Sequence, residues 1–232
     1  MRYIIRRLLD FIAPRTCAIC GCRLAPAEDV LCPVCQMHLP RTGYHEQPLD
    51  NSMAKLFFGI VPMERVSAYC FFTSGSGLAQ MIYKMKYHDR PDIGESLGHM
   101  MGRRLQPSGF FDGVDCLVPI PLAPKRLRQR GYNQSRQLAV GISEVTGLPV
   151  ADNLLSRSAF AGSQTKLGRW DRQQNVGSVF HLVGDADELR GRHVMLVDDV
   201  VTTGATTAAC ARELLKVEGV KVSLLAFAYS KS

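Results

Sequence analysis

The sequence predicts an α/β protein with a mostly parallel sheet, helices on both faces of that sheet, and a small metal-binding module at the amino terminus. Two observations lead to this fold class. Apolar runs of strand length alternate along the chain with longer segments of helical periodicity, which is the element order of a parallel sheet. Two Cys-x-x-Cys pairs, at residues 17–20 and 32–35, precede the first of these runs.

The overall composition is that of a globular, basic protein. The chain has 232 residues, of which 46% are hydrophobic, and this is enough for one sizeable core and a small module. Its formal net charge of +7 favours polyanionic partners. The first residues, MRYIIRRLLDFIAP, lack the features of a secretory signal and are too short for a transmembrane segment, so we expect a cytoplasmic protein. Their amphipathic pattern leaves open docking onto the protein's own core, onto a partner, or peripherally onto the inner membrane.

The two cysteine pairs are spaced as ligands of a structural zinc ion. Each Cys-x-x-Cys turn can aim two sulfurs at one ion, and four thiolates close a tetrahedral shell that leaves no position for water. Cys22 is a fifth thiol, which either competes as a ligand or stays free. The expected ligands are Cys17, Cys20, Cys32 and Cys35.

Changes in composition along the chain divide it into three parts. Residues 1–45 are expected to hold the amphipathic helix and the zinc module, residues 46–65 a linker rich in proline and glycine, and residues 66–232 the larger domain. Within the larger domain, apolar periodicity predicts alternating strands and helices. The expected strands are 66–73, 114–120, 176–183, 194–197 and 220–229, and the expected helices are 77–88, 92–105, 133–145 and 208–217.

A binding site is predicted at the end of the strand 194–197. Two carboxylates, Asp198 and Asp199, follow this strand, and a turn then leads into a helix. Backbone N–H groups at a turn and a helix start bind anions, whereas carboxylates accept hydroxyl groups, so the pattern predicts a sugar-phosphate site. The alternative is an ordinary helix cap beside two incidental acids. A Walker A loop and a dinucleotide fingerprint are excluded, because the residues that they require are missing. The turn residues expected to face the phosphate are Thr202, Thr203, Gly204, Ala205 and Thr206.

A cluster of basic residues is expected near the same end of the sheet. It follows the strand 114–120 through a proline-stiffened turn and precedes the helix 133–145. Such cations suit a diphosphate or, alternatively, a nucleic-acid backbone. The cluster consists of Lys125, Arg126, Arg128 and Arg130.

Residues 157–175 are predicted to form a mobile lid over the site, because they combine polar and basic side chains with little apolar periodicity. Lys166 lies within this lid. Trp170, the only tryptophan of the chain, either anchors the loop in the core or stacks on a base.

The segment VDDVVTTGAT resembles the phosphoribosyl-diphosphate (PRPP) motif of the type I phosphoribosyltransferases. Together with the cysteine pairs, the segment YKMKYHDR, the basic segment PIPL…KRLRQRGYNQ and the lid, it makes the chain resemble the ComF/GntX family over nearly its whole length. This resemblance implies a zinc ribbon joined to a type I phosphoribosyltransferase-like domain. It also implies a role in natural competence or in the use of external DNA as a nutrient.

The resemblance further implies a division of roles within the site. The two aspartates would hold the ribose hydroxyls, residues 201–206 would wrap the 5′-phosphate, and Mg²⁺ would bind together with PRPP. The catalytic candidates are Asp198, Asp199 and Lys166, and the cations expected at the diphosphate are Lys125, Arg126 and Arg130.

Three functions are compatible with these residues. The first is binding of PRPP, or of a nucleotide-type ligand, in the uptake or utilization of external DNA. The second is an active Mg²⁺-dependent phosphoribosyltransferase whose acceptor is unidentified. The third is a non-catalytic accessory protein that binds single-stranded DNA and works with proteins of the DNA-uptake machinery.

Overall fold

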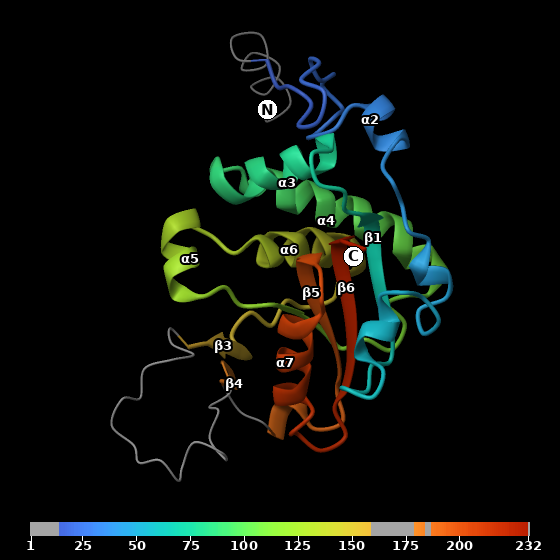
Figure 1. Ribbon diagram of the computed structural model, residues 1–232, viewed down its shortest axis with the longest axis vertical. Coiled ribbons are helices and arrows are strands. Elements are labelled where there is room, and N and C mark those ends of the chain that lie inside the picture. Colours follow the sequence, from blue (N-terminus) through green and yellow to red (C-terminus); the bar gives the residue numbers. More distant parts are fainter. Residues whose placement is uncertain (1–13, 159–178, 184–186, 232) are drawn as a thin grey trace.

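A four-stranded parallel sheet forms the centre of the computed structural model, which describes residues 14–158, 179–183 and 187–231. The strands lie side by side in the order β1-β6-β5-β2 (Figure 1). Beside this sheet, β3 (Leu155–Arg157) and β4 (Phe180–Leu182) form a small antiparallel pair. The parallel strands are β1 (Val66–Phe71), β2 (Cys116–Pro119), β5 (His193–Val201) and β6 (Lys221–Tyr229).

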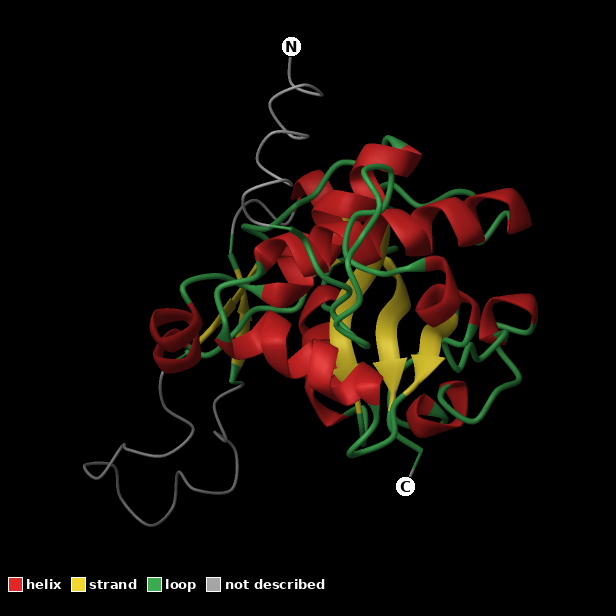
Figure 2. Ribbon diagram, turned by 90° about the horizontal axis from the view of Figure 1, so that it is seen from above, coloured by secondary structure: helices red, strands yellow, loops and turns green. Residues whose placement is uncertain are grey.

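Helices enclose the sheet on both faces, as predicted (Figure 2). One face is covered by α3 (Gly77–Tyr87), α4 (Pro91–Leu105) and α6 (Gln134–Thr146). The other is covered by α7 (Ala205–Leu214) together with the β3–β4 pair. The α/β class inferred from the element order is therefore confirmed. The two remaining α-helices of the described residues are α2 (Pro33–Met37) and α5 (Pro124–Arg130).

The continuous apolar run at the start of strand β5 is explained by burial on both faces of the sheet. Val194 and Leu196 pack in the layer that contains α7, whereas Met195 and Val197 pack against the helices of the opposite layer. All four side chains are fully buried. A strand that is covered on both faces has no solvent-facing positions, so the alternation of apolar and polar residues disappears.

Two glycines let α4 and α6 pack backbone against backbone. A Cβ on Gly98 would lie 2.9 Å from the Cα of Gly141, and a Cβ on Gly141 would lie 2.8 Å from the backbone nitrogen of His99. Both distances are too short for real side chains, so any larger residue would push the helices apart. A contact of 2.5 Å between His99 Nε2 and Glu144 Oε2 also joins the two helices. The close packing of α4 and α6 sets the position of α6, whose first turn reaches the end of β5.

Residues 46–65, which the sequence predicts as a linker, contribute to the core of the larger domain. They form a short 3-10 turn, Ala54–Phe57, in which Ala54 and Phe57 are buried. Met53 is also fully buried, and these side chains pack in the same layer as α7. Single 3-10 turns have neither helical nor strand periodicity, which explains why the sequence pattern did not indicate this packing.

Several element boundaries differ from the predicted ones. The proline-stiffened turn after β2 contains the unpredicted helix α5 (Pro124–Arg130), which is terminated by Gly131, a residue in the left-handed region with φ 76°. Strand β5 continues to Val201, and α7 begins three residues earlier than expected. The amphipathic segment at the amino terminus and most of the predicted lid, including Lys166 and Trp170, lie outside the described residues. No helix among the described residues is long and apolar enough to cross a membrane.

Candidate functional site

Asp198 and Asp199 lie inside the carboxyl-terminal part of β5 and not after it. Their strand stays paired with β6 beyond them, because Asp198 is opposite Ala226 and Val200 is opposite Ala228. The prediction that the strand ends before the two acids is therefore wrong by four residues. Val200 and Val201 continue the apolar ladder, and this places the two carboxylates on a rigid backbone.

Asp198 is held by the first turn of α6. Its Oδ1 accepts hydrogen bonds from the Ser135 hydroxyl at 3.2 Å and from the Asp199 backbone N–H at 2.8 Å. Burial and the adjacent Asp199 charge raise the pKa of Asp198 to about 7. A carboxyl group with this pKa changes its charge near neutral pH, unlike an ordinary surface aspartate.

Asp199 forms an ion pair with a lysine to which the sequence analysis assigned no role. Lys86 Nζ lies 2.8 Å from Asp199 Oδ2, and the two side chains are only 20% and 12% exposed. The other oxygen, Oδ1, accepts the Val200 backbone N–H at 2.6 Å. Lys86 belongs to the last turn of α3, within the segment YKMKYHDR. The family resemblance included that segment, but helical periodicity alone could not show that this side chain reaches β5.

The turn between β5 and α7 has the geometry of an anion site. Gly204 is in the left-handed region with φ 74°, and a Cβ there would lie 3.0 Å from Cζ of Phe57. The first hydrogen bond of the helix runs from the Ala208 N–H to the Gly204 carbonyl at 2.8 Å. Within the described part of the chain, the N–H groups of Thr206 and Thr207 have no acceptor. The buried Thr207 hydroxyl likewise has no partner there. The predicted turn residues Thr202, Thr203, Gly204, Ala205 and Thr206 are thus brought together around unpaired donors.

Three segments that are distant in the sequence meet beside the acid pair. The Tyr132 hydroxyl donates to the Met85 carbonyl, which joins the segment after α5 to the end of α3. Asn133 caps α6 and donates its side-chain amide to the Ile120 carbonyl at 3.0 Å, which joins the same segment to the end of β2. These bonds place α3, α5 and α6 around the carboxyl end of the sheet, where parallel sheets bind ligands.

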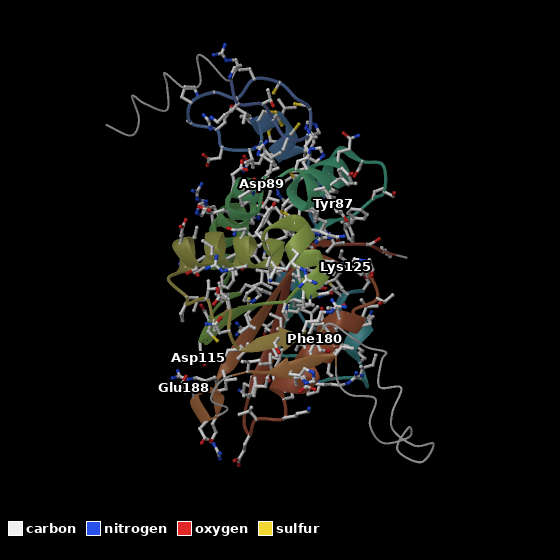
Figure 3. All side chains as sticks on the ribbon, turned by 90° about the vertical axis from the view of Figure 1, so that its left-hand side faces the viewer. Tyr87, Asp89, Asp115, Lys125, Phe180 and Glu188 are labelled. Carbon is white, nitrogen blue, oxygen red and sulfur yellow. The ribbon has the colours of Figure 1, made fainter. Side chains whose placement is uncertain are left out.

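The predicted basic cluster lies on α5, and within the described part of the chain Arg130 is its one member that contacts a neighbouring element. Arg130 donates to Gln134 Oε1 at 2.8 Å, and its guanidinium lies 5.2 Å from the ring centroid of Tyr87. Lys125 and Arg126 are exposed and, among the described residues, make no contact with the acid pair. Figure 3 shows Lys125 and Tyr87 on the same face of the molecule. The exposed members of the cluster are Lys125, Arg126 and Arg128.

The amino-terminal module brings its thiols together as a metal site requires. The distance between Cys20 Sγ and Cys32 Sγ is 3.8 Å, and the Cys35 backbone N–H donates to Cys32 Sγ at 3.5 Å. Hydrogen bonds, first of all from the Cys22 backbone, lower the pKa of Cys20 to about 6, which favours the thiolate that metals bind. This donor set fits a tetrahedral zinc ion. The four sulfurs that lie within 4.8 Å of one another are those of Cys17, Cys20, Cys22 and Cys32, so that Cys22 joins three of the four expected ligands.

The fold is an α/β fold of the type I phosphoribosyltransferase class. Three features indicate it: the order of the strands, the helical layers, and the acid pair that precedes the unpaired N–H groups at the start of α7. No protein-family model matches the chain. Among solved structures, the allosteric regulatory enzyme of purine biosynthesis aligns with a TM-score of 0.41 at 20% identity, over 61% of this chain and 29% of its own. A purine phosphoribosyltransferase from Pyrococcus horikoshii aligns with a TM-score of 0.34 at 14% identity, over 59% and 82% of the two chains.

Curated sequence relatives are named for DNA utilization and competence. The DNA utilization protein YhgH of Escherichia coli O157:H7 is 28% identical over 86% of this chain and 84% of its own. Competence protein F of Haemophilus influenzae is 36% identical over 44% and 45% of the two chains, and competence protein ComFC of Bacillus subtilis is 32% identical over 50% and 44%. The chain is therefore similar to proteins named for DNA utilization and competence, in line with the resemblance to the ComF family.

Proposed function

We propose that this protein binds PRPP or a ribose phosphate and acts in the uptake or utilization of external DNA. The observation that carries the proposal is the position of the Asp198–Asp199 pair next to the open N–H groups at the start of α7. Carboxylates accept the hydroxyls of a pentose, whereas the helix start and the turn at Gly204 receive its phosphate ester. The names of the relatives, which concern DNA utilization and competence, support the cellular role.

Mg²⁺ enters this proposal as part of the substrate. The ion prefers phosphate oxygens and water to a cage of protein ligands, so it would bind with the diphosphate of PRPP. The chain's own residues bind and orient the sugar. The cations of α5 proposed to reach the diphosphate are Lys125, Arg126 and Arg130. Lys166 keeps its predicted role at the leaving group, outside the described residues.

Calorimetry with PRPP and Mg²⁺ tests the proposal directly. The wild-type protein should bind, and Asp198→Asn should weaken binding by about 100-fold, because hydrogen bonds to a charged group are worth about 1.5–3 kcal/mol each. Asp50→Asn is the control, because Asp50 is a surface carboxylate, paired with the exposed Lys55. Binding that is absent from the wild type, or equally strong in Asp198→Asn, would contradict the proposal.

Catalysis is a separate question that the same pocket raises. Breakage of the bond between ribose C1 and the diphosphate leaves a cationic sugar, and cations near the diphosphate would stabilise the leaving group. Radiolabelled PRPP incubated with a panel of nitrogenous bases would show transfer as a new ribosyl product. Diphosphate release that depends on one base would establish a phosphoribosyltransferase, and no release with any base would leave a binding protein.

Single-stranded DNA binding is the second candidate, favoured by the exposed surface of α3 and α5. Tyr83 and Tyr87 are both 57% exposed, with ring centroids 4.8 Å apart, and Arg130 lies over the second ring. Aromatic rings beside cations suit a strand whose bases stack while its phosphates are neutralised. Gel shifts at increasing salt should show steep weakening. The variant Lys125→Ala/Arg126→Ala/Arg128→Ala should reduce the salt slope, and Arg103→Ala/Arg104→Ala, exposed cations of α4, is its control.

A further inference from the structure

We propose that Lys86 is the built-in counter-ion of the Asp198–Asp199 pair, so that the pocket binds a pentose phosphate without a divalent cation. The inference rests on the proposed sugar-phosphate site, and it specifies which positive charge balances the two carboxylates of that site. A divalent ion is then required only by the diphosphate of PRPP, and not by the protein's carboxylates.

The ion pair between Lys86 and Asp199 has the geometry of a persistent contact. Its 2.8 Å length and the low exposure of both side chains distinguish it from surface pairs such as Lys55–Asp50, whose side chains are 61% and 81% exposed. Exposed ion pairs contribute little to stability because water and salt screen their charges, whereas partly buried pairs are screened less. Lys86 is therefore expected to remain at Asp199 while the pocket is empty.

Backbone contacts hold Lys86 in place. The carbonyl of the preceding residue, Met85, accepts the Tyr132 hydroxyl. Two residues before Lys86, Lys84 Nζ donates to the Ala18 carbonyl at 3.0 Å. The end of α3 is thus fixed both to the segment before α6 and to the cysteine module. A side chain on such an anchored helix end delivers its charge at a defined position.

The remaining oxygens of the acid pair are poorly suited to a metal ion. Asp199 Oδ1 accepts the Val200 N–H, and Asp198 Oδ1 accepts both Ser135 and the Asp199 N–H. Among the described residues, His, Cys, Asp and Glu gather in groups of three or more in the cysteine module and at Glu95, His99 and Glu144, but not here. A divalent ion at Asp199 would have to displace the ammonium group or lie beside it against like-charge repulsion.

Ribose hydroxyls have no such conflict with Lys86. A hydroxyl group is neutral and can donate to Asp198 while Lys86 stays on Asp199. The phosphate ester is received by backbone N–H groups at α7, which need no metal either. The site can therefore bind a pentose phosphate without a metal ion, whereas the diphosphate of PRPP requires one.

Binding of ribose 5-phosphate with and without Mg²⁺ tests the inference. The Mg²⁺-free buffer should be prepared over a chelating resin, because soluble chelators would also compete for zinc in the cysteine module. Wild-type affinities in the two buffers should agree within about threefold. Lys86→Gln should bind about tenfold more weakly without Mg²⁺ and recover in its presence. Lys86→Arg keeps the charge and should stay independent of Mg²⁺.

Lys216→Gln is the control, because it breaks a Lys–Glu pair of 2.7 Å at the carboxyl end of α7, at the opposite end of this helix from the turn at Gly204. It should bind ribose 5-phosphate like the wild type in both buffers. A wild-type protein that binds ribose 5-phosphate only with Mg²⁺ would overturn the inference while leaving the sugar site intact. A wild-type protein that binds in neither buffer would overturn the proposed function as well.

Mn²⁺ binding followed by electron paramagnetic resonance gives a second readout that needs no sugar. Lys86→Gln removes the competing ammonium, so this variant should gain a Mn²⁺ site that is absent from the wild type and from Lys216→Gln. The gain should disappear in Lys86→Gln/Asp199→Asn. Equal Mn²⁺ binding by the wild type and Lys86→Gln would overturn the inference even if the variant bound sugar poorly for structural reasons.

Discussion

The Ser135 hydroxyl donates to Asp198 Oδ1 across 3.2 Å, and this bond connects the first turn of α6 to the end of β5. The contact joins two segments separated by more than 60 residues, and it connects helix packing to the chemistry of the site. Changes on either side of this bond therefore have measurable effects on ligand binding and on stability.

Removal of the Ser135 hydroxyl should shift the pH dependence of ligand binding. A hydrogen bond to a carboxylate favours its charged form, so Ser135→Ala should raise the pKa of Asp198 further above its usual value. If ribose binds to the ionised carboxylate, the pH midpoint of binding should move upward by about one unit. Calorimetry with ribose 5-phosphate between pH 5.5 and about pH 9 measures this shift. Ser143→Ala, further along the same helix, should leave the midpoint unchanged.

Asp198→Asn should stabilise the protein at alkaline pH. The pKa of Asp198 is raised in the folded state to about 7, so its contribution to stability is complete at acid pH and is lost as the pH rises towards that value. The neutral amide does not have this loss and can still accept the Asp199 N–H. Denaturant unfolding at pH 8 should show a gain of at most about 4 kcal/mol over the wild type. Near pH 4 the two proteins should be equally stable, and a gain that is the same at both values would contradict this origin.

Gly141→Ala should loosen the contact between α4 and α6. Its Cβ would meet the α4 backbone at Glu95 and His99, which cannot move without shifting the helix. We expect a loss of about 1–3 kcal/mol in the free energy of unfolding, and weaker sugar binding because Ser135 moves with α6. Gly77→Ala is the control, because its Cβ would meet the γ2 methyl group of Ile19, at 2.6 Å, and not the backbone of α4 or α6. Equal weakening of sugar binding by the two variants would contradict the proposed role of the helix contact.

Cys22→Ser and Cys35→Ser should each retain stoichiometric zinc, whereas the double variant should lose most of it. Cys22 lies within the group of close sulfurs, and Cys35 has the spacing expected of a ligand. Five thiols are thus available to an ion that needs four. Zinc content after dialysis, measured by atomic absorption, checks this outcome. Loss of zinc from one of the single variants would show that the other thiol cannot replace it.

The sequence predicted the long elements and the acid pair, because both have strong local patterns. The helices α3, α4 and α6 follow from apolar periodicity over three or more turns, and the sheet from buried strands with helices between them. Helix α5 was missed, because seven residues rich in arginine have little apolar periodicity. The role of Lys86 was missed for a different reason. A lysine on a helix is ordinary by sequence, and only tertiary packing brings it to Asp199.

The ring of Phe57 above Gly204 limits how this domain can be isolated. A fragment that begins at Val66 would contain every strand of the described residues, yet it would lack the aromatic side chain that packs against the turn between β5 and α7. Excision or transplantation of the domain should therefore begin upstream of the short 3-10 turn Tyr44–Glu46. In evolutionary terms, the segment between the cysteine module and β1 should be inherited with the turn between β5 and α7, even though it contains none of the residues proposed to bind the ligand.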